Sequence, residues 1–192
     1  MSNSDLPLRE RMLAEATRLF VAYGYNGISM REIAEAVGVS KAGLYYHFKD
    51  KQDLFLAILA DNLLSIGQLV EQASSAGAST RAQIGQLVRA LFAQPSEQRS
   101  VIRLASLEMA HLSPEARAAF GRDYEQQFVG RIAAILQAGV ARGDLRPIDP
   151  RAATWLLLGM MYPFFTPNPN YDRIPEPMID LLLTVFFDGT AA

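Results

Sequence analysis

The residues from 40 to 48, which read SKAGLYYHF, combine side-chain types that suit contact with a nucleic acid. On a helical wheel at about 100° per residue, Leu44 and Phe48 share an apolar face. The opposite face, centred on Ala42 and Tyr46, combines small residues, tyrosine hydroxyls and lysine instead of mixing both charge signs. Small residues let a backbone approach a duplex closely, and tyrosine hydroxyls can bond phosphates or base edges. We therefore expect a helix that docks by one face and contacts double-stranded DNA by the other.

Positive charge is concentrated in the same part of the chain. The net charge of −2 argues against a protein that coats nucleic acid through bulk electrostatics. The three lysines, Lys41, Lys49 and Lys51, nevertheless lie within eleven residues, and the cations elsewhere are arginines. Lys41, Lys51 and the intervening His47 suit phosphate contacts, whereas Lys49 is as readily a solvated side chain. The helix has no arginine, glutamine or asparagine for bidentate base contacts, so we expect specificity to depend on tyrosine, lysine, close backbone approach and DNA shape.

Local signals upstream position this helix. Ser29 followed by Glu32 is a capping box, which predicts a short helix that begins directly after the serine. Gly38 suits the left-handed exit from that helix, and Ser40 is the N-cap of the next. Two short helices joined by a turn that contains glycine match the helix-turn-helix unit, whose second helix enters the major groove. The first helix can add phosphate contacts through N–H groups at Ser29 and the guanidinium of Arg31.

Helical periodicity of about 3.6 residues recurs from end to end, without a strand-like alternation longer than a few residues. The sequence predicts an all-α fold of about nine helices. We expect an N-terminal three-helix, helix-turn-helix DNA-binding domain at residues 1–50 and a second helical domain at residues 51–192. The helices are expected at about residues 8–23, 30–37, 41–48, 51–73, 80–93, 96–112, 114–142, 150–162 and 176–187.

The composition excludes several kinds of site. The chain has no cysteine, which excludes disulfides, thiolate chemistry and cysteine-ligated metals, and His47 and His111 are its only histidines. Paired carboxylates and serine–histidine–acid patterns are missing from the sequence, so we expect no metal, no cofactor and no catalytic residue. The longest apolar run, residues 155–165, is shorter than the roughly 18–20 residues of a membrane helix, and residues 1–12 lack a signal-peptide pattern. We expect a cytoplasmic protein without a membrane partner.

The segment GYNGISMREIAEAVGVSKAGLYYHFKDKQDLFLAIL closely resembles the N-terminal DNA-binding domain of the TetR family of transcriptional regulators. The resemblance covers roughly residues 8–60 and rests on Gly24 to Gly27, the Ser29 cap, Ile33–Ala34, Gly38–Val39, Leu44–Tyr45, His47–Phe48 and Lys51. Members of this family are usually dimers through their last two helices and hold a small molecule among the middle helices. The resemblance therefore implies that residues 51–192 form a helical effector-binding and dimerisation domain. It also implies that these positions approach DNA: Ser29, Arg31, Lys41, Ala42, Gly43, Tyr45, Tyr46, His47 and Lys51.

The middle helices carry residues suited to an apolar effector. Aromatic and methionine side chains with a few polar tips are typical of such pockets. Glu108 and His111 lie three residues apart on an otherwise apolar helix, where they can meet a polar group of a ligand or equally face solvent. For the aromatic residues and the methionine, the alternative is ordinary core packing. The candidate effector-binding residues are Phe92, Glu108, Met109, His111, Tyr124, Phe128, Trp155 and Tyr162.

The last two predicted helices are apolar on almost every face. A helix that is apolar all round must be covered all round, and a second subunit is one such cover. A four-helix interface across a two-fold axis would allow two recognition helices about 34–36 Å apart, the spacing that reads a palindrome. The alternative is a simple buried core. The predicted interface residues are Leu157, Met161, Leu182, Val185 and Phe186.

These expectations describe a ligand-responsive transcriptional regulator. We expect a repressor that binds a palindromic operator as a homodimer and is released when a small, mainly apolar effector occupies the C-terminal domain. One alternative is a small all-α enzyme, which the lack of a catalytic pattern argues against. Another is a ligand-binding or protein-interaction module without DNA binding, which would present a third helix free of cations. The lysines argue against that alternative.

Overall fold

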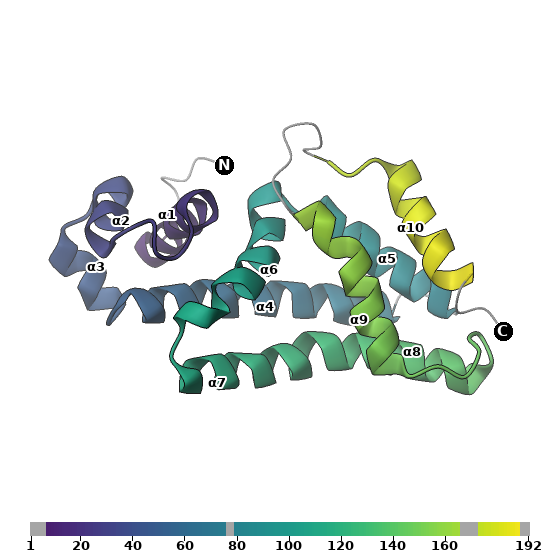
Figure 1. Ribbon diagram of the computed structural model, residues 1–192. Coiled ribbons are helices and arrows are strands. Elements are labelled where there is room, and N and C mark those ends of the chain that lie inside the picture. Colours follow the sequence, from purple (N-terminus) through teal and green to yellow (C-terminus); the bar gives the residue numbers. More distant parts are fainter. Residues whose placement is uncertain (1–6, 76–78, 166–172, 189–192) are drawn as a thin grey trace. The chain divides into compact units, whose positions relative to one another are not determined.

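The computed structural model describes residues 7–75, 79–165 and 173–188, and the regular elements within them are all helical (Figure 1). This confirms the predicted all-α class. The helix expected at residues 114–142 is observed as α7, a π-helical segment η3 and α8 in direct succession. The helix expected at residues 96–112 is shorter than predicted: α6 ends at Glu108 and a separate 3-10 turn, η2, follows it. The elements are α1 (Leu8–Tyr23), α2 (Met30–Val37), α3 (Lys41–His47), α4 (Lys51–Ser75), α5 (Thr80–Ala93), α6 (Ser96–Glu108), η2 (Met109–His111), α7 (Pro114–Tyr124), η3 (Glu125–Val129), α8 (Gly130–Arg142), α9 (Pro150–Met161), η4 (Tyr162–Phe165) and α10 (Glu176–Asp188).

The chain forms two compact units. The first contains Met1–Asn62 and Ser100–Phe120, and the second contains Leu63–Arg99 and Gly121–Ala192. The first unit includes part of α6 and α7 because these residues pack with the N-terminal helices; the backbone N–H of Ser113, for example, donates to Oε1 of Gln52 at 2.8 Å. The predicted division after residue 50 separates a DNA-binding part from an effector-binding and dimerisation part, and this division by function stays a prediction.

Helices α1, α2 and α3 of the first unit pack around a small apolar core. Phe20 of α1, Ile33 of α2 and Leu44 of α3 have no exposed surface, and neither has Phe55 near the start of α4. The rings of Phe20 and Phe55 meet edge to face, with their centroids 5.3 Å apart. This core fixes the orientation of α3 because Leu44 anchors that short helix by one side.

The turn between α2 and α3 follows from local signals. Both hydrogen bonds of the predicted capping box are present, with the Ser29 N–H donating to Oε2 of Glu32 at 2.8 Å and the Glu32 N–H donating to Oγ of Ser29 at 3.2 Å. Gly38 ends α2 with a φ of 79°, a left-handed conformation that a glycine adopts without steric cost. Ser40 then caps α3 by accepting the Gly43 N–H at 3.0 Å.

Helix α4 is long and apolar because it contributes a continuous buried stripe. Within the described residues, α4 is the one helix that is long and apolar enough to cross a membrane. One side of the helix is nevertheless packed inside the protein, and its buried side chains include Leu54, Ile58, Leu63, Ile66 and Val70. A core helix satisfies the same length and composition test, so this stripe reads as protein interior.

The second unit is built on α5, α8, α9 and α10 (Figure 1). Helices α5 and α8 approach closely where Gly139 meets Thr80. The approach requires glycine, because any Cβ at position 139 would overlap the threonine side chain. Helix α10 is fastened to α5 by Arg89, whose guanidinium pairs with Glu176 and, at 2.5 Å, with Asp180. Small residues and ion pairs thus set the packing of helices that are otherwise apolar.

Asp144, just after α8, fastens the start of α5. Its Oδ2 accepts hydrogen bonds from the Thr80 N–H at 3.1 Å and the Thr80 hydroxyl at 2.8 Å, and Nη2 of Arg142 lies 3.0 Å away. The hydrogen bonds from Thr80, followed by that from Arg142, hold the pKa of the Asp144 carboxyl below its ordinary value of 3.8. A group with a depressed folded-state pKa stabilises the fold above its unfolded-state pKa, and the contribution is lost as pH falls.

Replacing this carboxylate is therefore expected to lower the thermal stability in a pH-dependent way. Asp144→Ala should lower the Tm at neutral pH by about 2–4 °C, the shift expected for one lost capping interaction in a chain of this size. The difference should shrink on acidification below about pH 4, since wild type then loses the same interaction. Thermal unfolding by circular dichroism measures this, with the exposed Asp123→Ala as control. A Tm difference that is independent of pH would contradict the assignment.

Candidate nucleic-acid interface

Helix α3 presents the two faces that the sequence predicts. Leu44 is fully buried, and Phe48, the residue that ends the helix, is 2% exposed. Tyr46, on the opposite side, is 85% exposed. An aromatic ring that is so exposed contributes little to packing within its own unit, so Tyr46 is available to contact a partner.

The remaining side chains of α3 flank Tyr46. Tyr45 is 42% exposed, and Nζ of Lys41 lies 5.7 Å from the centre of its ring. The half-buried His47 meets Tyr46 edge to face, with ring centroids 5.3 Å apart. Ala42 is exposed, which leaves the backbone of the first turn accessible. Together these residues form a surface of aromatic, cationic and small side chains, typical of contact with a sugar–phosphate backbone and groove edges.

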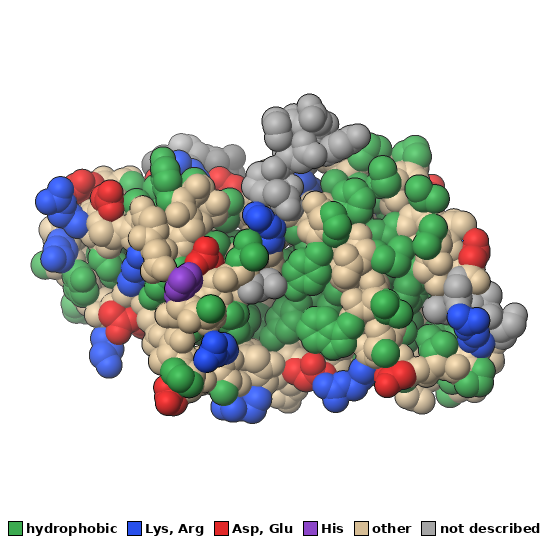
Figure 2. Space-filling model, viewed as in Figure 1, with side chains coloured by type: hydrophobic (Ala, Val, Ile, Leu, Met, Phe, Trp, Pro, Cys, Tyr) green, Lys and Arg blue, Asp and Glu red, His purple; other side chains and the backbone are tan. Residues whose placement is uncertain are grey.

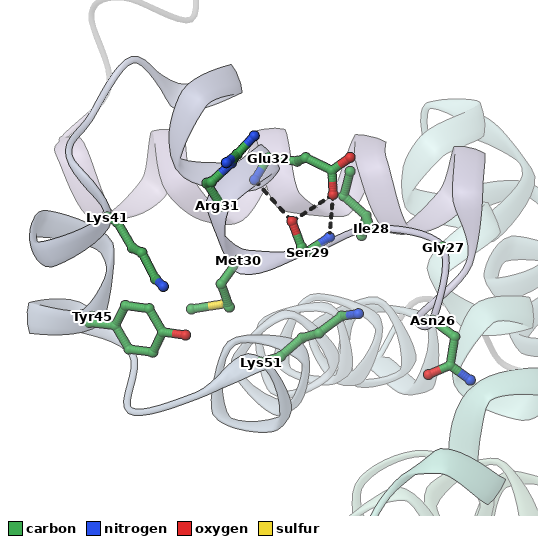
Figure 3. Close-up of a pocket in the computed structure, with 10 residues that line it drawn as sticks. All are labelled: Asn26, Gly27, Ile28, Ser29, Met30, Arg31, Glu32, Lys41, Tyr45 and Lys51. Carbon is green, nitrogen blue, oxygen red and sulfur yellow. Dashed lines mark hydrogen bonds between the residues drawn. The ribbon is translucent and has the colours of Figure 1, made fainter.

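A pocket of about 440 Å³ lies beside this surface (Figure 3). Figure 3 shows Lys41 and Tyr45 converging from α3 on a space that Lys51 borders from the start of α4. Two cations and a hydroxyl around one concavity suit a phosphate. Five of the residues predicted to approach DNA line this pocket: Ser29, Arg31, Lys41, Tyr45 and Lys51. The other lining residues are Asn26, Gly27, Ile28, Met30 and Glu32.

The capping box changes how the start of α2 can serve this pocket. The Ser29 hydroxyl donates to Oε2 of Glu32 at 2.6 Å, and the hydrogen bonds from Ser29 lower the pKa of the Glu32 carboxyl. The serine side chain and N–H are thus already engaged. A helix start leaves further N–H groups without intrahelical partners, and here these belong to Met30 and Arg31. The Met30 side chain cannot serve a phosphate, but its backbone N–H can.

Lys51 is held at the lower edge of the pocket. Its Nζ lies 4.7 Å from the centre of the Tyr25 ring. Burial lowers the pKa of the Lys51 ammonium, while the charges of Glu32 and Glu108 oppose this shift. Nearby acidic groups thus favour the charged form that a phosphate contact requires.

Arg31 is engaged with an acidic neighbour. Its Nε lies 3.1 Å from Oε1 of Glu35, one helical turn along α2, and both side chains are well exposed. Figure 3 shows the Arg31 side chain directed away from the space shared by Lys41, Tyr45 and Lys51. A phosphate contact by Arg31 therefore requires this exposed ion pair to open, which costs little.

Removing the competing carboxylate is expected to strengthen DNA binding. Glu35→Gln frees Arg31, and the affinity for a duplex should rise about twofold to fivefold, the range of an exposed ion pair. Fluorescence anisotropy at fixed salt measures this. Glu71→Gln, which removes the same charge from an ion pair with Arg131 in the second unit, is the matched control. An equal rise in DNA affinity in both variants would show that the effect comes from net charge and not from the release of Arg31.

The candidate effector residues fall into two groups. Tyr124 lies 5.4 Å from Phe128 and 6.4 Å from Trp155, measured between ring centroids. Burial, followed by the neighbouring Tyr162, raises the pKa of the Tyr124 phenol. Phe92 is buried against Phe164 and Phe165 at the end of the same unit's η4.

The second group belongs to the other unit. Glu108, Met109 and His111 lie at the end of α6 and in η2, among residues of the first unit. His111 stacks on Tyr25 with ring centroids 6.0 Å apart, and Glu108 lies 3.3 Å from the His111 ring. The prediction of one helix for these residues was wrong, because α6 ends at Glu108 and Met109 and His111 form the separate turn η2. The sequence spacing also did not reveal that their partners are near residue 25, because that pairing spans more than eighty residues.

The predicted interface residues are mostly interior. Leu157, Met161, Leu182 and Phe186 are buried within the single chain, and Val185 alone of the five is exposed. Figure 2 shows hydrophobic side chains gathered over α9 and α10. The exposed apolar side chains of these helices are Trp155, Leu156, Leu181 and Val185, and a groove of about 400 Å³ between the helices is lined in part by Leu156, Met160, Val185 and Phe186.

Clusters that suit a metal ion are not found in the described part of the chain. No group of three or more histidine and acidic side chains comes together within residues 7–75, 79–165 and 173–188.

Comparison with known proteins links this architecture to regulators. The AcnR repressor of Corynebacterium diphtheriae is 34% identical over 73 residues, 38% of this chain and 38% of that protein. The KstR2 repressor of Rhodococcus jostii is 26% identical over 138 residues, 72% of this chain and 68% of that protein. The alignments with the AcnR repressors thus span little more than a third of their length.

Solved structures share the fold. AibR in complex with isovaleryl coenzyme A and operator DNA is 24% identical, with a TM-score of 0.80 over 93% of this chain and 97% of that chain. A regulatory protein of the tetR family from Rhodococcus RHA1 is 23% identical, with a TM-score of 0.80 over 94% and 97%.

Two family models match successive parts of the chain. Residues 12–58 match the bacterial regulatory proteins of the tetR family, and residues 77–164 match a tetracyclin repressor-like C-terminal domain. Together the two matches cover more than half of the 192 residues. The chain therefore belongs to the TetR family of transcriptional regulators.

Proposed function

We propose that the protein is a ligand-responsive repressor that binds palindromic DNA as a homodimer. The observation that carries the proposal is the exposed face of α3, with Tyr46 beside Lys41 and next to the pocket that Lys51 borders. A buried Leu44 holds this face rigidly, as a helix that enters a major groove requires. Repressors among the similar proteins, such as AcnR and KstR2, support the direction of regulation.

Dimerisation is proposed through the outer faces of α9 and α10. Leu156 and Val185 are exposed on adjacent helices and border the same groove. Several large apolar side chains exposed together are typical of a surface that is covered in the working protein. A two-fold pairing of these helices would join two recognition helices, and a single helix of seven residues contacts too few base pairs for specific binding.

The effector is proposed to bind beside Tyr124, Phe128, Trp155 and Tyr162. These side chains combine apolar rings with two hydroxyl groups and an indole N–H, a lining that suits a mainly apolar ligand with a polar end. The π-helical segment η3 lies next to Tyr124, and π-helical turns within α-helices often accompany functional sites. The similar AibR was solved with isovaleryl coenzyme A and operator DNA, which supports a fold able to hold both kinds of ligand.

Selection of bound sequences from random duplex DNA tests the proposal without knowledge of the operator. We expect enrichment of an inverted repeat with half-site centres about 10 base pairs apart, or a multiple of that spacing. Mass spectrometry of the native protein should then identify a bound small molecule whose addition weakens the complex with the selected DNA. Failure to enrich any sequence would contradict DNA-specific binding, and would favour a ligand-binding protein without that function.

A further inference from the structure

The short turn η2, outside the helix-turn-helix segment, contacts the loop that follows α1. Nδ2 of Asn26 lies 3.1 Å from Nδ1 of the His111 ring, and His111 stacks nearly parallel on Tyr25, at an interplanar angle of 7°. Glu108 reaches the same loop, since its Oε1 would lie 3.0 Å from a Cβ at Gly24. The loop is thus held by residues more than eighty positions away.

These contacts continue to the pocket beside α3. Tyr25, which carries the stacked His111, also lies under the Lys51 ammonium, and its ring packs edge to face against Phe55 of the same helix α4. Asn26, bonded to the His111 ring, is itself part of the pocket lining (Figure 3). A continuous path of ring and polar contacts therefore joins η2 to the lower edge of the proposed phosphate site.

Held side chains bind better than mobile ones. A free lysine loses rotamer freedom when it contacts a phosphate, whereas a lysine already restrained by a neighbouring ring has less to lose. Lys51 is restrained by Tyr25, and Tyr25 is restrained in turn by the His111 ring. His111 itself lies outside the pocket lining.

We propose that His111 is a positioning residue for DNA binding: its ring, stacked on Tyr25, holds Lys51 ready for a phosphate. The inference rests on the proposed function, because it requires that Lys51 contact DNA. It departs from the effector role that sequence spacing suggested for His111. The contact to DNA is made by Lys51, and His111 acts only through Tyr25.

A double-mutant cycle with a mixed-sequence DNA duplex tests the inference. Phosphate contacts supply most non-specific binding, so the operator is not needed. Lys51→Ala should weaken binding and reduce the slope of log affinity against log salt by about one. His111→Ala should weaken binding about threefold to tenfold in wild type and have no effect in the Lys51→Ala background, because coupled residues are not additive. His111→Phe, which keeps a ring on Tyr25, should retain the affinity within about twofold.

The controls separate positioning from folding and from the proposed function. Glu115→Ala, an exposed change on α7 of the same unit, should leave binding unchanged, and each variant should keep the helical circular dichroism of wild type. Additive losses of DNA affinity for His111→Ala and Lys51→Ala would overturn the inference and leave the proposed function standing. A His111→Phe variant that binds DNA as weakly as His111→Ala would do the same. A wild-type protein that binds no duplex would contradict the proposed function as well.

Discussion

A double replacement on the outer faces of α9 and α10, Leu156→Glu with Leu181→Glu, is expected to convert the protein into a folded monomer that binds its operator at least about a hundredfold more weakly. The two leucines are 68% and 56% exposed in the single chain, so their removal costs little internal packing. Glutamates facing one another across a two-fold axis would repel and leave charge buried. Each half-site would then be bound separately, without the gain of linking two contacts.

Sedimentation and anisotropy with the selected operator measure this prediction together. Leu64→Glu with Leu107→Glu is the matched control, because these two leucines are 59% and 56% exposed on α4 and α6. The control pair should leave both the oligomeric state and the operator affinity close to wild type. A dimer that survives the Leu156 and Leu181 changes would show that the subunits meet by another face.

The second large effect is expected at the reading face of α3. Tyr46→Ala should weaken operator binding about tenfold to a hundredfold, since its aromatic ring is 85% exposed and contributes little to packing in the fold. The Tm should stay near the wild-type value for the same reason. Lys41→Ala should weaken binding uniformly across sequences and reduce the salt slope by about one, as expected for a phosphate contact.

Gel-shift titration at fixed salt, with the selected operator and a scrambled duplex, distinguishes these two roles. Tyr23→Ala is the matched control, because this tyrosine is 61% exposed at the end of α1 and lies outside the DNA pocket. Tyr46→Ala should lose more affinity for the operator than for the scrambled duplex, whereas Lys41→Ala should lose the same factor for both. Unchanged operator binding in both variants would exclude α3 as the recognition helix.

Much of the helix-turn-helix segment could be predicted because its signals are local. The capping box of Ser29 and Glu32, the left-handed Gly38 and the Ser40 cap each act within four residues, and all are present as expected. Leu44 and Phe48 lie one helical turn apart, so one side of α3 could be assigned to the core from spacing alone. The hydrogen bond from the Ser29 hydroxyl to Glu32 is additional to that motif, and Met30 and Arg31 provide the N–H groups without intrahelical partners at the start of α2.

The other helices show where local pattern is insufficient. Helices α9 and α10 are apolar nearly all round, so periodicity cannot say which side meets the core. The structure buries Leu157 and exposes Leu156, its immediate neighbour, because α9 packs against α8 by one side only. Likewise, nothing near His111 in the sequence indicates Tyr25 or Asn26 as its partners.

The sequence by itself determined the class of fold, the boundaries of α1, α2 and α5 and the two faces of α3, since caps, turns and periodicity operate over a few residues. Only the tertiary structure decided which residues share the pocket with Lys51, which apolar side chains of α9 and α10 remain uncovered, and why His111 belongs with the DNA-binding helices. The physical reason is that these features depend on contacts between distant segments, and such contacts are chosen by packing of the whole chain.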